Sequence, residues 1–269
     1  MSWKTPLRHL VRRLARRQGY DLVEYPPLTI RRRARLLANF EIDLLLDVGA
    51  DTGEYVQTLR ARGYTGRVVS FEPLSASFAK LRESAADDPR WETVNVALGD
   101  RDGRAVMHVA GNMHSSSLRD MQPAHLEAAP HSAYVGTETV TVRRLDALFD
   151  EYRRDAANVF MKIDTQGYEQ DVLAGAARTL PQIAGLQLEM SLVELYGGQM
   201  LFPQLCELIA DHGFTLMSLE PGFANDRTGQ LLQVDGVFFR LARPLKTWQR
   251  QQPGAAADAG AAPALSGTN

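Results

Sequence analysis

The chain has little cysteine: Cys206 is the only one among its 269 residues. One thiol cannot form an internal disulfide, and it cannot build a structural zinc site that needs several thiolates. Long apolar runs are missing as well, because no stretch approaches the ~20 residues that a membrane-spanning helix requires. The first residues lack the apolar segment of a secretory signal, so we expect a cytoplasmic protein.

Lysine is also scarce, since only four of the 30 basic residues are lysine, a bias that we attribute to genomic composition. The formal net charge of −2 is unevenly spread: residues 1–37 hold ten Arg or Lys against Asp21 and Glu24, so the remainder of the chain is acidic. A nucleic-acid-binding protein is expected to carry positive charge on the face that reads or reacts. This distribution therefore argues against a nucleic-acid partner.

The rest of the composition, 45% hydrophobic and 23% charged, is that of a soluble globular protein. We expect a basic helical arm over residues 1–39, a folded domain over 40–245 and a disordered Ala/Gly/Pro-rich tail over 246–269. Within the arm, residues 4–18 set an apolar stripe among arginines, which predicts an amphipathic helix. This helix packs on its own domain, docks on an anionic membrane, joins a partner subunit in a homodimer or binds an acidic substrate, and the sequence leaves these alternatives open.

Short apolar runs alternate with segments of helical period through the middle of the chain. Strands are expected at residues 44–48, 68–71, 93–98, 159–163, 186–189, 215–219 and 237–241. Helices are expected at residues 53–62, 75–86, 168–179 and 203–212, and an additional strand pair at 104–109 and 138–143. This alternation predicts an α/β fold whose mostly parallel sheet is covered by helices on both faces.

The first candidate site is the turn that follows the strand at residues 44–48. Gly49 lets a ligand approach the backbone, Gly53 lets the next helix start close to the sheet, and Asp51 between them tolerates left-handed geometry. Asp47 and Asp51 make a poor seat for a pyrophosphate, because acidic side chains repel it. They suit a cationic or hydroxyl-rich ligand.

Glu72 strengthens this interpretation, because it ends the next strand 19 residues after Gly53. An acidic residue at that distance can accept hydrogen bonds from both hydroxyls of a ribose. The alternative is a surface glutamate that caps the following helix. Together with the acidic turn, Glu72 favours S-adenosylmethionine, whose sulfonium is positively charged, over NAD.

Five segments then carry a family resemblance: DVGADTG (47–53), FEP (71–73), NVALGD (95–100), SSSL (115–118) and KIDTQGYEQDVLAGA (162–176). In this order and spacing, the chain resembles the FkbM-type S-adenosylmethionine-dependent methyltransferases over about residues 43–241. The resemblance implies the Rossmann-like fold of class I methyltransferases, with a seven-stranded sheet, and methyl transfer to a hydroxyl group. Asp51 stands where the family usually has asparagine, a change that preserves the geometry of the turn.

The resemblance also implies roles for individual residues. Asp47, Gly49, Asp51 and Gly53 would flank the methionine portion of the cofactor, and Glu72 would hold the ribose. At the other end, adenine would lie against Ala97 and Leu98, which are equally suited to the plain core.

A hydroxyl acceptor must lose its proton during attack, to a general base or with the help of a metal ion. Asp164 ends one predicted strand, Glu189 ends the next, and Asp235 precedes the last. With the sheet order of class I methyltransferases, which the resemblance implies, two or three of these acids converge at the cofactor edge. There Asp164 and Glu189 would position and deprotonate the acceptor, and the three acids together would hold Mg²⁺. The alternative is that each acid caps a helix or binds a backbone amide. His114, in a polar loop, is the other candidate base.

The resemblance implies O-methylation of a sugar, oligosaccharide or glycolipid, with a methylmannose polysaccharide precursor as a narrower hypothesis. Tyr134, Tyr196 and Phe223 are candidate platforms on which a sugar ring would stack. Two rival interpretations stay open: an NAD-dependent oxidoreductase that uses the same turn and Glu72, and a non-catalytic nucleoside-binding module whose basic arm docks on a membrane.

Overall fold

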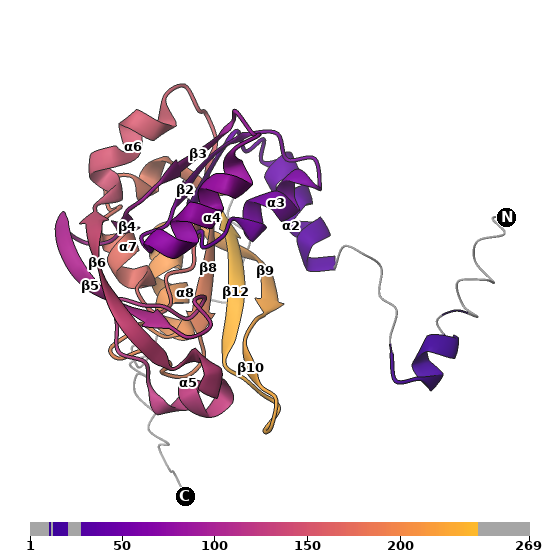
Figure 1. The fold of residues 1–269 in the computed structure, drawn as a ribbon. Helices are drawn as coiled ribbons and strands as arrows, with labels where there is room; N and C mark the ends of the chain where they lie inside the picture. The colour runs from indigo at the N-terminus through magenta and orange to yellow at the C-terminus, as the bar shows by residue number, and fades with distance from the viewer. Residues whose placement is uncertain (1–10, 12, 21–27, 242–269) are drawn as a thin grey trace, which may run out of the picture.

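The computed structural model describes residues 11, 13–20 and 28–241. Its central element is a seven-stranded sheet in the order β3-β2-β1-β7-β8-β12-β9 (Figure 1). The strands are β1 (Leu44–Val48), β2 (Arg67–Phe71), β3 (Trp91–Val94), β7 (Val159–Ile163), β8 (Ile183–Ser191), β9 (Thr215–Pro221) and β12 (Gln233–Phe239). Neighbouring strands are parallel except β12, which runs antiparallel to both β8 and β9.

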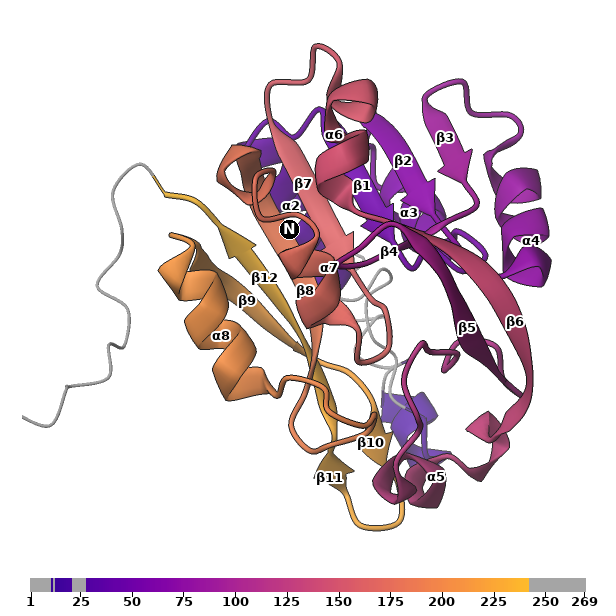
Figure 2. The same cartoon turned by 90° about the vertical axis from the view of Figure 1, so that its left-hand side faces the viewer.

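Helices cover both faces of this sheet (Figures 1 and 2). Leu45 of β1 packs in one apolar cluster with side chains of α2, α3 and α4, whereas its neighbours Leu44 and Leu46 pack in another with side chains of α6, α7 and α8. Strands buried on both faces explain the nearly continuous apolar runs in the sequence. The helices are α2 (Leu28–Asn39), α3 (Glu54–Arg60), α4 (Ser75–Ala85), α6 (Leu145–Arg153), α7 (Glu169–Ala174) and α8 (Phe202–Asp211).

A smaller sheet in the order β4-β6-β5 stands beside the carboxyl edge of the main sheet (Figure 2). It contains β4 (Ala97–Leu98), β5 (Gly103–Ala110) and β6 (Tyr134–Arg143), with β5 and β6 paired antiparallel. The β5–β6 connection carries α5 (Pro123–Ala128) and the short 3₁₀ helix η1 (Pro130–Ser132). The remaining elements are the 3₁₀ helix η2 (Leu180–Gln182) and a hairpin of β10 (Ala224–Asn225) and β11 (Gln230–Leu231).

The Rossmann-like α/β fold and the extra strand pair are confirmed, but two predicted strands were wrong in detail. Residues 93–98 do not form one strand, because the side chain of Asn95 donates hydrogen bonds to the backbone carbonyls of Glu72 and Pro73 at 2.9 and 3.0 Å. The chain bends there, so β3 and β4 belong to different sheets. The last strand begins at Gln233 rather than at residue 237, so Asp235 lies inside β12 and not before it.

The helix predicted at residues 168–179 is also shorter than expected, since α7 ends at Ala174. The next residue, Gly175, packs directly against the backbone of Gly99, where a Cβ atom would overlap the Gly99 carbonyl. Residues 175–179 form turns instead of continuing the helix.

Part of the predicted basic arm is joined to the domain. Helix α2 lies within residues 1–39, its Leu37 is buried in the core, and its Arg33 forms a 2.6 Å ion pair with Glu220 of β9. Of the helix predicted at residues 4–18, residues 13–17 are helical and most of the rest lies outside the described residues, as does the whole predicted tail at 246–269. Among the residues that the structure describes, no helix has the length and apolarity needed to span a membrane.

Candidate active site

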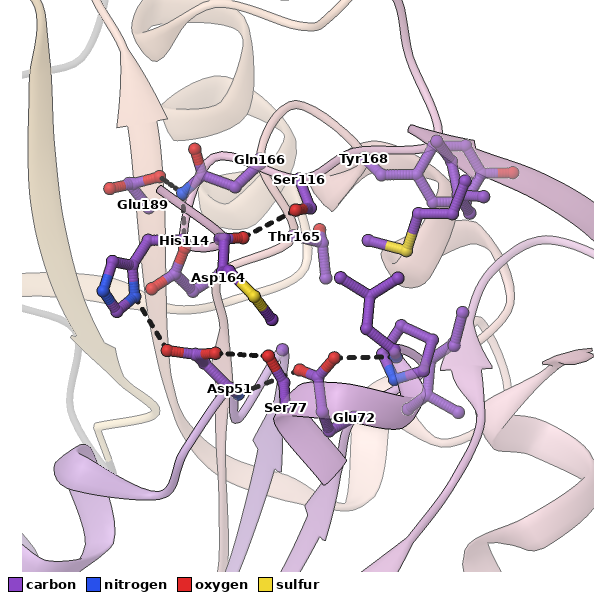
Figure 3. Close-up of a pocket in the computed structure, with 18 residues that line it drawn as sticks. Asp51, Glu72, Ser77, His114, Ser116, Asp164, Thr165, Gln166, Tyr168 and Glu189 are labelled. Carbon is purple, nitrogen blue, oxygen red and sulfur yellow. Dashed lines mark hydrogen bonds and ion pairs between the residues drawn. The ribbon is translucent and has the colours of Figure 1, made fainter. Parts of the chain in front are cut away.

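A cavity of about 240 Å³ opens at the carboxyl ends of β1, β2, β7 and β8, and Met107 of β5 also lines it (Figure 3). Ligands of open α/β sheets bind at this edge, because loops and helix N-termini converge there. The residues predicted for the site that line the cavity are Gly49, Asp51, Glu72, Ala97, Leu98, His114, Asp164 and Glu189. The predicted site residues Asp47, Gly53 and Asp235 do not line it.

The turn after β1 forms one wall of the cavity. Gly49, Asp51 and Gly53 have φ angles of 72°, 47° and 87°, so the left-handed geometry expected of Asp51 is confirmed. A Cβ atom on Gly49 would overlap the backbone carbonyl of Asp164, and one on Gly53 would lie 2.7 Å from the ring of Trp91. Glycine is therefore required at both positions by the close approach of neighbouring elements as well as by the backbone angles.

Glu72 links this turn to the start of α4. Its two carboxylate oxygens accept hydrogen bonds from the backbone N–H groups of Asp51 and Leu74, both at 2.9 Å. The residue is 5% exposed, and burial raises the pKa of Glu72 to about 7 although both hydrogen bonds act to lower it. The carboxyl group is thus fixed in position at the cavity wall and changes charge near neutral pH.

Asp51 joins three segments of the wall. Its carboxylate accepts a 2.7 Å hydrogen bond from the Ser77 hydroxyl and lies 2.7 Å from Nδ1 of His114 (Figure 3). The His114 side chain is 70% exposed and comes from the loop between β5 and α5. This contact ties the loop across the mouth of the cavity to the turn after β1.

The acidic end of the cavity holds Asp164 and Glu189, which the side-chain amide of Gln166 connects. Nε2 of Gln166 donates to Oδ1 of Asp164 at 2.8 Å and to Oε2 of Glu189 at 2.6 Å (Figure 3). Gln233 donates a second hydrogen bond to the same Glu189 oxygen at 2.8 Å. Burial raises the pKa of Glu189 well above its ordinary value, and the negative charges of Asp164 and Asp235 raise it further.

Below the cavity floor, Lys162 sits between two carboxylates. Its ammonium lies 3.4 Å from Asp47 and 3.4 Å from Asp164, and it donates a 2.8 Å hydrogen bond to the Gly49 carbonyl. Burial alone would lower the pKa of Lys162, but the two acids outweigh it and the pKa is raised. Asp47 is 0% exposed and also accepts a hydrogen bond from Ser70, so it supports the floor rather than facing a ligand.

Glu169 shapes the loop that carries Gln166. One of its carboxylate oxygens accepts hydrogen bonds from the backbone N–H groups of Thr165 and Gly167, at 3.0 and 3.2 Å. Burial raises the pKa of Glu169 to about 7. The side chain is buried and belongs to the support of the site.

The predicted magnesium site does not fit the positions of the three acids. Glu189 accepts two amide hydrogen bonds, Asp164 faces Gln166 and Lys162, and Asp235 accepts from the Gln187 amide at 3.3 Å outside the cavity. Within the described part of the chain, no three His, Cys, Asp or Glu side chains are grouped to hold a metal ion.

The opposite end of the cavity is apolar. Among the lining residues, Leu74, Ala97, Met107 and Leu118 pack in one apolar cluster, and Leu98 and Tyr168 belong to the adjoining core cluster. Figure 3 shows Tyr168 across the cavity from Glu189, so a flat aromatic group at this end would contact hydrocarbon side chains. Tyr168 is a lining residue that the sequence analysis did not single out, although it stands in the same KIDTQGYEQ segment as Asp164. The cavity thus has an apolar end, a fixed carboxyl group beside it and an acidic end.

Two further residues, Tyr196 and Gln166, have positions that the sequence did not predict. Tyr196, proposed as an exposed platform for a sugar, is 0% exposed, and its hydroxyl donates to Oε1 of Gln166 at 2.6 Å. Gln166 was missed altogether. The available indication was its position between Asp164 and Gly167 in the most specific of the shared segments.

The sequence of this chain is similar to those of known methyltransferases. Residues 47–216 match the sequence model of the methyltransferase FkbM domain. The 2-O-methyltransferase NoeI of Sinorhizobium fredii (strain NBRC 101917 / NGR234) is 28% identical over 172 residues, which cover 62% of this chain and 70% of NoeI.

Two solved structures of methyltransferases match this chain at low sequence identity. The methyltransferase FkbM from Methylobacillus flagellatus KT has a TM-score of 0.44 and 17% identity, and the match covers 73% of this chain but only 44% of that longer one. Magnesium protoporphyrin IX methyltransferase (ChlM) from Synechocystis PCC 6803, solved with bound SAM, has a TM-score of 0.43 and 13% identity, with 90% and 98% of the two chains covered.

Proposed function

This chain belongs to the FkbM methyltransferase family, and on that premise we propose that it transfers a methyl group from S-adenosylmethionine to a hydroxyl group of a saccharide. The observation that carries the proposal is the order of groups along one cavity. An apolar end, the carboxyl group of Glu72 and an acidic end follow one another. They complement an aromatic base, a ribose and a positively charged sulfonium in the same order.

The residues present fit the methyl donor. Leu74, Ala97 and Leu98 would contact the adenine, and the Glu72 carboxylate would accept hydrogen bonds from the ribose hydroxyls. Gly49 and Asp51 would flank the methionine portion. When bound, the donor supplies a methyl group already activated by its sulfonium, so the protein's task is alignment of the acceptor and removal of its proton.

Glu189 is the best-placed base for that proton. Both amide donors bind its Oε2, and no described residue donates a hydrogen bond to its Oε1. During methyl transfer, Oε1 would take the proton that the acceptor hydroxyl loses. A raised pKa suits this role, because general bases work best when their pKa lies near the working pH. Asp164, with its side chain 36% exposed, would hold the acceptor by a second hydrogen bond.

The proposed class of acceptor follows from the carboxylates that line the cavity. Asp51, Asp164 and Glu189 present carboxylates that repel anionic groups and accept hydrogen bonds from hydroxyls. NoeI, whose name specifies transfer to a numbered oxygen, supports O-methylation. An uncharged sugar, oligosaccharide or glycolipid headgroup is the acceptor we propose, and a methylmannose polysaccharide precursor stays the narrower hypothesis. The cytoplasmic location, the membrane contact and the homodimer stay predictions of the sequence.

Calorimetric titration tests the cofactor, with S-adenosylhomocysteine and NAD as the two ligands. We expect S-adenosylhomocysteine to bind and NAD not to bind, because the carboxylates around the turn oppose a pyrophosphate. Transfer of a labelled methyl group to a panel of neutral and anionic saccharides then tests the acceptor, with and without a chelator. Turnover restricted to anionic acceptors, or NAD binding in place of the nucleoside, would contradict the proposal.

Glu72 predicts a pH dependence of cofactor affinity. Its pKa is about 7, and ribose hydroxyls donate to its ionised form, so affinity for S-adenosylhomocysteine should fall as the pH drops below 7. The fall approaches tenfold per pH unit at most, as linkage to one proton requires. Titrations between pH 8 and pH 5.5 measure it. Glu72→Gln should bind more weakly at pH 8 and lose the slope; a slope retained in this variant would instead implicate Glu169.

A further inference from the structure

Gln166 has a backbone conformation that its surroundings must impose. Its φ angle is 54°, in the left-handed region that residues other than glycine rarely adopt. Such a conformation is unfavourable and persists where neighbouring contacts impose it, often at functional sites. The loop between β7 and α7 therefore aims this side chain at the cavity, which Gln166 lines.

The side-chain amide of Gln166 uses all its hydrogens in the acid pair. It has two N–H hydrogens, and the two contacts of Nε2, at 2.8 and 2.6 Å, take one each to Asp164 and Glu189. Its carbonyl oxygen accepts the 2.6 Å hydrogen bond from the Tyr196 hydroxyl. A 180° turn of the amide would place the carbonyl oxygen against two carboxylates, so a single orientation is stable.

Tyr196 holds the side-chain amide of Gln166 in this orientation. It is fully buried, and its ring lies edge-on to the His125 ring at a centroid distance of 5.2 Å. A Cβ atom on Gly167 would lie 2.6 Å from Cβ of Tyr196, so the loop rests directly on this residue. The hydroxyl has one hydrogen, and the contact to Gln166 at 2.6 Å is shorter than the one to the Ser115 carbonyl at 3.2 Å.

We infer that Gln166, held by Tyr196, is a positioning residue that fixes the carboxylates of Asp164 and Glu189 for methyl transfer. Because Gln166 and Gln233 both occupy Oε2 of Glu189, the other oxygen is left for the acceptor. The amide also separates two carboxylates that would otherwise repel each other. This inference rests on the proposed function and adds a residue pair that acts through the two acids without touching the reacting atoms.

The test is a double-mutant cycle with Gln166→Met, Tyr196→Phe and both together, measured as kcat, acceptor KM and affinity for S-adenosylhomocysteine. Methionine has similar length but no amide. We expect Q166M to lower kcat about 100-fold and Y196F to lower it about fivefold, with cofactor affinity changed less than about threefold. In the Q166M background, Y196F should add less than about twofold, because its effect passes through Gln166.

Tyr64→Phe is the matched control, since its hydroxyl donates to the backbone carbonyl of Arg67 and Tyr64 does not line the cavity. We expect its kcat to stay within about twofold of the parent chain. Additive effects of Q166M and Y196F, or a loss of cofactor affinity that matches the loss of kcat, would overturn the inference. If Q166M does not fold, Y196F alone tests the inference. A fall in kcat without a fall in affinity for S-adenosylhomocysteine would support it, and any other result would overturn it. The parent chain separates the two hypotheses, because its own failure to bind the nucleoside or methylate any saccharide refutes the proposed function instead.

Discussion

Alanine in place of Gly49 is expected to abolish binding of S-adenosylhomocysteine and to lower the free energy of unfolding by about 3–4 kcal/mol. Two costs add: left-handed geometry at φ 72° disfavours alanine, and its Cβ atom would overlap the carbonyl of Asp164. The carboxyl ends of β1 and β7 must then move apart, which displaces the residues that line the cavity on both strands. Urea unfolding and calorimetric titration measure the two effects.

Gly63→Ala provides the matched control for this substitution. Its φ angle is 85°, but no atom lies within 4 Å of the position that a Cβ would take. It should therefore show the conformational cost alone, about 1 kcal/mol, and leave cofactor binding unchanged. If G49A is no less stable than G63A, the close contact between the two strand ends is not needed for the site.

The parts of the site that follow from local sequence could be predicted. The strand, the glycine turn and Glu72 lie within 29 residues. The residue types in this short segment are compatible with only a few backbone conformations, so the local sequence is enough to predict it. Asp164 and Glu189 were found for a different reason. Parallel strands bring their carboxyl ends to one edge, so acids at the ends of two strands must meet if the strands are neighbours, as β7 and β8 are.

Contacts between side chains from distant elements could not be predicted in this way. Asp47 is directly opposite Lys162 in the register of β1 and β7 and pairs with it. Because of this pairing, Asp47, which was predicted to flank the cofactor, is buried and supports the floor of the cavity. The sequence indicated Tyr196 as a candidate aromatic platform for a sugar ring. In the structure Tyr196 is buried, and its hydrogen-bond partner Gln166 lies 30 residues earlier in another loop. The break at Asn95 likewise depends on carbonyls that belong to the segment after β2. Each of these outcomes is set by packing, which periodicity and spacing do not record.

The same limitation applies to the segment before the family match. Arg33 of α2 carries no motif, but its guanidinium reaches Glu220 and stacks over the ring of Tyr55 at 5.1 Å. Tyr55 in turn donates to Gln187 at 2.8 Å, and Gln187 donates to Asp235. A chain of polar contacts thus connects the basic segment to the strands that carry the acids. The charge asymmetry of the sequence did not indicate which of its alternatives applies, and α2 packs on the domain.

Glu189→Gln is expected to lower kcat by about 10²–10⁴-fold while leaving the protein folded and able to bind S-adenosylhomocysteine. The glutamine oxygen can still accept from both Gln166 and Gln233, so the support of the side chain is kept. The amide nitrogen replaces Oε1 and cannot take a proton from the acceptor. Single-turnover transfer of a labelled methyl group measures the loss, and thermal unfolding checks the fold.

The stability of this variant tests the same claim independently. Burial and neighbouring acids raise the pKa of Glu189, which means that the folded protein disfavours its negative charge. Removing that charge should leave the melting temperature unchanged or higher at pH 8, where more of the carboxylate is ionised. Asp235→Asn is the matched control: Asp235 is the register partner of Glu189 on β12 and also has a raised pKa, but it lies outside the cavity. Loss of one nearby charge should cost D235N less than about tenfold in kcat. Equal losses of kcat in E189Q and D235N would mean that the two acids act through their negative charge alone and that Glu189 is not the base. A loss of kcat confined to a His114→Ala variant would instead identify His114, in the loop between β5 and α5, as the base.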